Sequence, residues 1–188
     1  MRNQPSINNK NTPHPSRKSP RLAQYDYSAT GHYFVTICTR EKQCLLGKII
    51  GDAVCLNSAG QMIASAWKTL PERFEQVDLD SFVVMPNHVH GIIILKKSVF
   101  LTRVIQAFKS VTTHEYIRGV HGQGWKKFDG TLWQRSFYDH VIRKDKDLSR
   151  IQEYILNNPL QWALDDENPD RKNLSHAGRT QGPPLHTK

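Results

Sequence analysis

Two histidines separated by a single residue are the side chains of this 188-residue chain best suited to metal chemistry. His88 and His90 lie between the turn formers Pro86-Asn87 and an apolar run from Ile92 to Leu95. A second short apolar run ends just before the turn, so the pattern predicts a tight hairpin whose second strand begins at the histidines. Side chains alternate along a strand, which places both imidazoles on one face, where they could hold one divalent cation.

A helix far downstream could supply a third ligand and a nucleophile. The segment from Asp147 to Asn158 carries an apolar stripe and stops at Pro159. Tyr154 and Asn158 are one turn apart and fall together on one flank of that stripe. The Asn158 oxygen could complete a metal site, and a bound metal would polarise a phosphodiester for attack by the Tyr154 phenol.

Plainer interpretations of these residues remain open at this point. A His-x-His pair can merely form local hydrogen bonds at a strand end. Tyr154 can be a packing residue where a helix meets a sheet. A phenol also has a pKa near 10, so it needs a neighbouring cation or base before it attacks phosphorus.

The charge balance indicates a polyanionic partner. The chain has 26 Lys and Arg against 17 Asp and Glu, a formal net charge of +9, and nucleic acid is the commonest polyanion. Between residues 96 and 127 the only acid is Glu115, which favours phosphate contacts by Arg103 and Lys109 over a merely solvated face. The mixed aromatic and basic stretch 132–143 suits base stacking and phosphate pairing, or an ordinary strand. Its candidate DNA-binding residues are Trp133, Arg135 and Arg143.

Cysteine usage and hydropathy bear on the compartment. Cys38, Cys44 and Cys55 are odd in number and lack C-x-x-C spacing, so they predict neither a zinc knuckle nor a disulfide framework. The chain shows no signal-peptide h-region and no apolar run long enough to span a bilayer. We therefore expect a soluble cytoplasmic protein without a membrane partner.

The order of predicted elements indicates an α+β fold. Apolar patterns predict a strand at 33–39, a hairpin around Gly51-Asp52 and a helix from a Ser58 cap to Leu70. The hairpin strands 79–84 and 88–95 follow, then a helix over 99–118, a glycine-rich loop over 119–130 and a strand over 132–143. This order predicts a ferredoxin-like βαββαβ core, with an antiparallel sheet, helices on one face and an added C-terminal helix.

The ends of the chain should lie outside that core. Residues 1–24 contain four prolines and five basic residues with no acid, which predicts a disordered arm that could contact phosphates. The domain should span 25–166, and 167–188 should form a polar tail. The chain is expected to fray from Asp165 onward.

Several motifs together resemble one family, the REP-associated tyrosine transposases and their insertion-sequence relatives of the HUH superfamily. The resemblance covers roughly residues 20–168 and is most specific in the pairing of Met-Pro-Asn-His-Val-His at 85–90 with Tyr-Ile-Leu-Asn-Asn-Pro at 154–159. The other matching stretches are Tyr25-Asp26-Tyr27, Tyr33 to Thr39, Phe108-Lys109-Ser110 and Trp133 to Arg143.

The resemblance implies an enzyme that recognises a hairpin in single-stranded DNA. The tyrosine, Tyr154, would cut a nearby phosphodiester, form a 5′-phosphotyrosine link and rejoin strands by the reverse reaction. It further implies that His88, His90 and Asn158 hold Mg²⁺ or Mn²⁺, and that the protein acts as a monomer or a homodimer. Two alternatives remain: a relative that only binds hairpin nucleic acid, and a metal phosphodiesterase that uses water.

Overall fold

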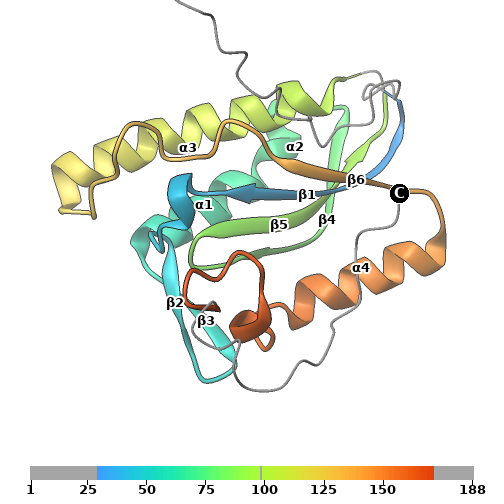
Figure 1. Cartoon of the computed structure of the whole chain (residues 1–188). Helices are drawn as coiled ribbons and strands as arrows, with labels where there is room; N and C mark the ends of the chain where they lie inside the picture. The colour runs from blue at the N-terminus through green and yellow to red at the C-terminus, as the bar shows by residue number, and fades with distance from the viewer. Residues whose placement is uncertain (1–28, 98, 172–188) are drawn as a thin grey trace, which may run out of the picture.

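A four-stranded antiparallel sheet forms the centre of the molecule in a computed structural model, which describes residues 29–97 and 99–171 (Figure 1). Its strand order is β4 (Val77–Val84), β5 (His88–Leu95), β1 (Gly31–Cys38) and β6 (Tyr138–Ile142). β5 and β1 occupy the centre, with Thr36 paired to His90 and Cys38 paired to His88. The hairpin strand that carries the histidines is therefore flanked by strands on both sides.

Helices cover both faces of this sheet. α1 (Ser58–Lys68) and α3 (Leu101–Gln123) pack on one face, and α4 (Asp145–Asn157) lies across the other, as Figure 1 shows. The ferredoxin-like βαββαβ core is thus confirmed, with α4 as the added helix. The remaining elements are α2 (Leu70–Arg73), the predicted hairpin of β2 (Gly47–Ile50) and β3 (Ala53–Leu56), and two 3₁₀ turns, η1 (Arg40–Lys42) and η2 (Trp162–Leu164).

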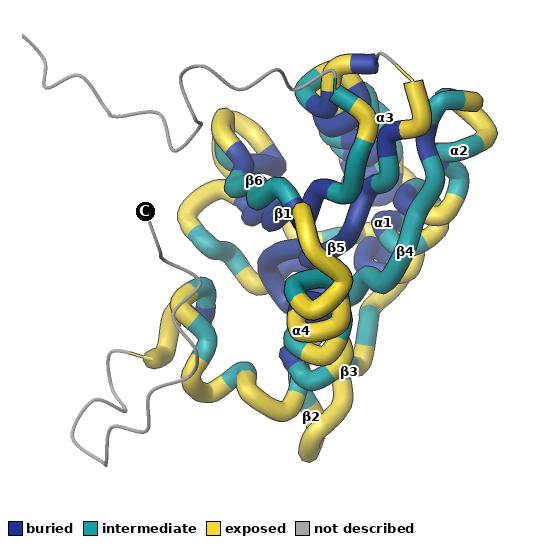
Figure 2. Tube along the Cα trace, turned by 90° about the vertical axis from the view of Figure 1, so that its right-hand side faces the viewer, coloured by how far each residue is buried: buried dark blue, intermediate teal, exposed yellow. Residues whose placement is uncertain are grey.

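Strand alternation divides the apolar residues between two cores. Figure 2 shows that the central strands β1 and β5 are mostly buried. The larger core faces α1 and α3, and there Trp67 stacks edge-on against Phe108. The smaller core faces α4 and contains Phe34 and Ile92 from the sheet and Ile151 and Ile155 from the helix. These four side chains are all fully buried, so this small core fixes α4 against the strand that carries the histidines.

Three predicted boundaries were wrong. The Asn57 side chain, not Ser58, caps α1 by accepting a hydrogen bond from the Gly60 N–H at 2.9 Å. α3 continues to Gln123, so the predicted loop at 119–130 begins later. The strand predicted at 132–143 is shorter, because 131–137 bends away from the sheet edge and touches it through one bridge, Thr39 with Trp133.

Along the described residues no helix is both long and apolar enough to cross a membrane. The predicted arm at 1–24 lies outside the described residues, as does the tail beyond Arg171.

The glycine between His90 and Ile92 yields a stability prediction. A Cβ on Gly91 would clash with the fully buried Trp67 ring, so Gly91→Ala should lower the free energy of unfolding by about 1–3 kcal/mol. The control is Gly122→Ala in α3, which meets nothing within 4 Å and should raise it by about 0.5 kcal/mol. Urea unfolding monitored by circular dichroism measures both, and equal effects would contradict the close contact.

Candidate metal and nucleophile site

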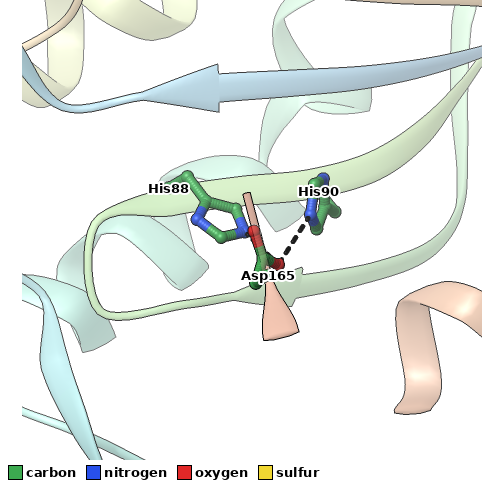
Figure 3. A group of neighbouring side chains, drawn as sticks. All are labelled: His88, His90 and Asp165. Atoms are coloured by element: carbon green, nitrogen blue, oxygen red, sulfur yellow. Dashed lines mark ion pairs between the residues drawn. The ribbon is translucent and has the colours of Figure 1, made fainter. Parts of the chain in front are cut away.

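The two histidines lie side by side on the face of the sheet that α4 covers. A hydrogen bond from the Met85 N–H to the His88 carbonyl, 2.8 Å long, closes the hairpin and sets where β5 begins. The ring centroids of His88 and His90 are 4.3 Å apart, and both side chains are buried. Asp165, from the segment after α4, places Oδ2 at 3.9 Å from Nε2 of His88 and 4.0 Å from Nε2 of His90 (Figure 3).

Partners on the other ring nitrogens orient both imidazoles. The Asn87 Oδ1 lies 2.8 Å from His88 Nδ1, and because a carboxamide oxygen only accepts, that nitrogen carries the hydrogen. The Thr36 hydroxyl lies 2.9 Å from His90 Nδ1. This is the usual supporting arrangement for metal-ligating histidines, with Nε2 left facing the cluster.

α4 brings the two predicted helix residues to the same place. The Tyr154 hydroxyl lies 3.3 Å from His90 Nε2, and the Asn158 Nδ2 donates to Asp165 Oδ2 at 3.0 Å. His88, His90, Tyr154 and Asn158, predicted from distant parts of the sequence, are therefore brought together.

The donors in this cluster fit a divalent cation. His88 Nε2 and Asn158 Oδ1 are buried and have no hydrogen-bond partner, although a buried polar atom normally has one. His88, His90 and Asp165 each offer a ligand atom within 4.8 Å of the others. Two imidazole nitrogens and two oxygens form a set that binds first-row divalent metals.

Polar contacts at both outer strands hold α4 in position. In β4 the register shifts between Leu79 and Phe82, and the Asp80 carboxylate in this bulge accepts two 3.0 Å hydrogen bonds from the Gln152 amide. On β6, His140 Nε2 lies 3.0 Å from the Asp147 carboxylate in the first turn of α4. The helix is thus tied to both outer strands of the sheet by residues that precede Tyr154.

Burial keeps the site uncharged apart from Asp165. Burial, followed by the Lys42 charge, lowers the pKa of His88 to about 3. Burial, followed by the neighbouring His88, lowers the pKa of His90 well below its ordinary 6.5. Burial and then the Asp165 carboxylate raise the pKa of Tyr154 far above 10. Both imidazoles are therefore neutral, as metal binding requires, and the phenol stays protonated until a cation comes near it.

Asp165 is the residue that sequence reasoning missed, because the chain was expected to fray from there. Instead the segment folds back: Trp162 lies 6.1 Å from the His88 ring, and the Glu167 carbonyl accepts from Asn87 Nδ2 at 2.7 Å. Asp-Asp-Glu at 165–167 is a recognisable acidic cluster. Nothing local in the sequence, however, indicates that it returns to a histidine pair far upstream.

The predicted DNA-binding residues are not all exposed. Arg103, Arg135 and Arg143 are exposed, and their contact with DNA stays a prediction. Trp133 is corrected: it is only 4% exposed, and its indole N–H donates to Thr112 at 2.9 Å, so it cannot stack on a base. The Lys109 ammonium donates to the carbonyls of Gln134 and Ser136, which anchors the irregular segment before β6.

The depressed histidine pKa values predict a pH-dependent stability in metal-free buffer. Unfolded histidines take up protons near pH 6.5 while the folded ones stay neutral, so the unfolded state binds more protons as the pH falls. The free energy of unfolding should therefore drop from pH 7 towards pH 4, by up to about 1.4 kcal/mol per pH unit for each histidine. Urea titrations with EDTA should show a smaller slope in His88→Asn, and an unchanged slope would contradict the assignment.

Comparison with known proteins identifies the family. The protein-family model described as "Transposase IS200 like" matches residues 31–158, which include every strand of the central sheet and α4. An uncharacterized protein of Haemophilus influenzae strain Rd is 37% identical over 164 residues, covering 79% of this chain and 91% of that protein. A second protein of the same strain, assigned by name to the REP-associated tyrosine transposases, is 27% identical over 143 residues and covers 72% of this chain and 74% of its own length.

A solved structure shares the fold. It is a REP-associated tyrosine transposase bound to a REP hairpin, with a TM-score of 0.53, 24% identity and 74% of each chain covered. The match extends over more than two thirds of each chain. The chain belongs to the IS200-like transposase family.

Proposed function

We propose that this protein cuts and rejoins single-stranded DNA beside a hairpin through a 5′-phosphotyrosine intermediate, with Tyr154 as the nucleophile. The observation that carries the proposal is the 3.3 Å approach of the Tyr154 hydroxyl to Nε2 of a buried, neutral histidine pair. This contact places the phenol beside the proposed metal ligands, where a bound cation could activate it. Membership of a transposase family supports DNA as the substrate.

The metal proposed for the site is Mg²⁺ or Mn²⁺. The residues that would hold it are His88 and His90 through Nε2, Asn158 through Oδ1 and Asp165 through its carboxylate. When bound, such a cation offsets negative charge on the phosphate and lowers the pKa of a nearby phenol. The buried, unpartnered atoms of His88 and Asn158 support this assignment.

The chain's own residues then carry out an in-line exchange. The Tyr154 oxygen bonds to phosphorus and loses its proton to solvent, and the bond from phosphorus to the 3′ oxygen breaks. That oxygen takes up a proton and leaves as a 3′-hydroxyl. Rejoining reverses these steps with another 3′-hydroxyl, so no nucleotide cofactor is consumed.

Charge and a structural relative support hairpin DNA as the partner. The net charge of +9 favours a polyanion, and the related solved structure contains a REP hairpin. A single copy of the chain supplies every residue of the proposed site: His88, His90, Tyr154, Asn158 and Asp165. We therefore expect one copy to be sufficient for cleavage.

The nucleophile assignment predicts the loss of a covalent adduct. Wild-type protein incubated with a labelled single-stranded hairpin and Mn²⁺ should give a denaturation-resistant protein–DNA band, with label retained only when it lies 3′ of the cut. Tyr154→Phe should reduce adduct formation at least about 1000-fold, because water has no positioned activator to replace the phenol. Hairpin binding and stability should change little, since the ring remains.

Tyr138→Phe serves as the matched control, because Tyr138 is a half-buried tyrosine on β6 in the same small core. It should form the adduct at the wild-type rate. An adduct with Tyr154→Phe would assign the nucleophile elsewhere. Cleavage without an adduct would favour the water-using phosphodiesterase, and binding without cleavage would favour a protein that only binds hairpins.

The metal assignment predicts one Mn²⁺ site per chain by calorimetry. His88→Ala or His90→Ala should abolish it together with cleavage, while hairpin binding survives. Asp165→Asn should weaken Mn²⁺ binding about 10-fold or more, because it removes a charged oxygen ligand. Asp166→Asn is the control, an exposed neighbour paired with Arg171, and should leave the affinity unchanged. Equal affinities in all four variants would refute the site.

A further inference from the structure

We propose that Lys42 binds the scissile phosphate, with its ammonium placed against a non-bridging oxygen of the DNA strand beside the histidine pair. This inference rests on the proposed function and adds a cationic residue to that site. Lys42 follows β1, and no motif in the sequence distinguishes it from the other lysines of a basic chain.

The backbone at Lys42 is held in an unusual conformation. Glu41 and Lys42 both have a φ of 56°, and they are the only non-glycine residues with positive φ in the described chain. Side chains other than glycine rarely adopt this left-handed region, and such conformations persist only where the surroundings impose them. The turn η1 is therefore held in a conformation that its surroundings impose.

Asn87 connects this turn to the first histidine. Its Nδ2 donates to the Lys42 carbonyl at 2.9 Å, and its Oδ1 accepts from His88 Nδ1 at 2.8 Å. The Asn87 side chain is fully buried, so one rigid amide sets the positions of both Lys42 and His88. A single link of this kind can hold a cation at a constant distance from the metal ligands.

The Lys42 ammonium already binds an anion at the edge of the site. It lies 3.3 Å from Oε2 of Glu167 and donates to the Asp166 carbonyl at 2.6 Å. These partners are the two residues that directly follow Asp165, and the Glu167 side chain is 25% exposed. Rotation of that side chain into solvent would leave the ammonium facing the position where the carboxylate stood.

The electrostatic influence of Lys42 reaches the reaction site. Burial lowers the pKa of His88 and the Lys42 charge adds to that fall, whereas burial raises the pKa of the Cys38 thiol and the Lys42 charge opposes that rise. Since both groups lie on the face of the sheet beneath α4, a phosphate that enters there would meet the same positive field. A fixed cation of this kind stabilises the extra negative charge that a phosphodiester acquires during attack.

Two substitutions test the charge of the Lys42 side chain separately from its left-handed backbone conformation. Lys42→Asn removes the ammonium but tolerates the left-handed conformation, and Lys42→Arg keeps a cation. Lys42→Asn should lower the rate of adduct formation about 100-fold, with the denaturation midpoint unchanged, and Lys42→Arg should restore at least a tenth of the wild-type rate. Lys68→Ala, an exposed lysine on α1 across the sheet, is the control and should behave as wild type.

A binding cycle in the uncleavable Tyr154→Phe background identifies the group that Lys42 contacts. Hairpin oligonucleotides carry either the normal phosphate or a neutral methylphosphonate at the cleavage position mapped with wild-type protein. With Lys42 present the normal phosphate should bind about 10-fold more tightly, and with Lys42→Asn the difference should fall below about 2-fold.

The outcomes distinguish the two proposals. If wild-type protein forms no adduct, the proposed function fails. If wild type forms the adduct and Lys42→Asn forms it equally fast, or loses affinity for both oligonucleotides alike, only the role of Lys42 is overturned. The second pattern would indicate a general contribution of Lys42 to DNA binding or to the fold.

Discussion

The fully buried side chain of Asn87 is the constraint on which the rest of the site depends. Its oxygen fixes the tautomer of His88, and its nitrogen donates both to the turn after β1 and to the segment that follows α4. One side-chain amide at the tip of a hairpin is therefore hydrogen-bonded to three stretches that are far apart in the sequence. An aspartate of the same shape has no N–H to donate, so the two carbonyls at Lys42 and Glu167 would each lose a partner.

A second constraint is that α4 must lie at a defined position along the face of the sheet. Its apolar stripe, packed on Phe34 and Ile92, would not by itself fix its position along the small core, because apolar contacts are non-directional. The bulge in β4 prevents this by aiming Asp80 at Gln152, and the contact between His140 and Asp147 fixes the other side. Directional hydrogen bonds thus set the position of the helix, while apolar burial supplies most of the free energy that keeps it docked.

Periodicity and local chemistry predicted much of this protein from sequence. The strand pattern around the His-x-His pair fixed which face both rings occupy, and the helix pattern placed Tyr154 beside Asn158. Asp165 and Lys42 escaped prediction because their roles depend on where the chain returns in space, which neither period nor propensity encodes. Trp133 was misassigned for a related reason: an aromatic residue among basic ones suits both base stacking and a core, and only the burial of the bent segment decides.

In the proposed function, burial is also what would keep the site inactive until a cation binds. The neutral histidine pair and the protonated phenol surround one charged side chain, Asp165. Its negative charge further raises the pKa of the Tyr154 phenol. In these surroundings the protonated phenol is a poor nucleophile toward a negatively charged phosphate. Positive charge must enter for the phenolate and the phosphate to coexist in a low-dielectric space. The structure offers two places for it, the atoms left unpartnered between His88 and Asn158, and the ammonium of Lys42 at the edge. In the proposed mechanism one is filled only when metal is present and the other is permanent, so holding the DNA phosphate and activating the tyrosine would fall to separate cations.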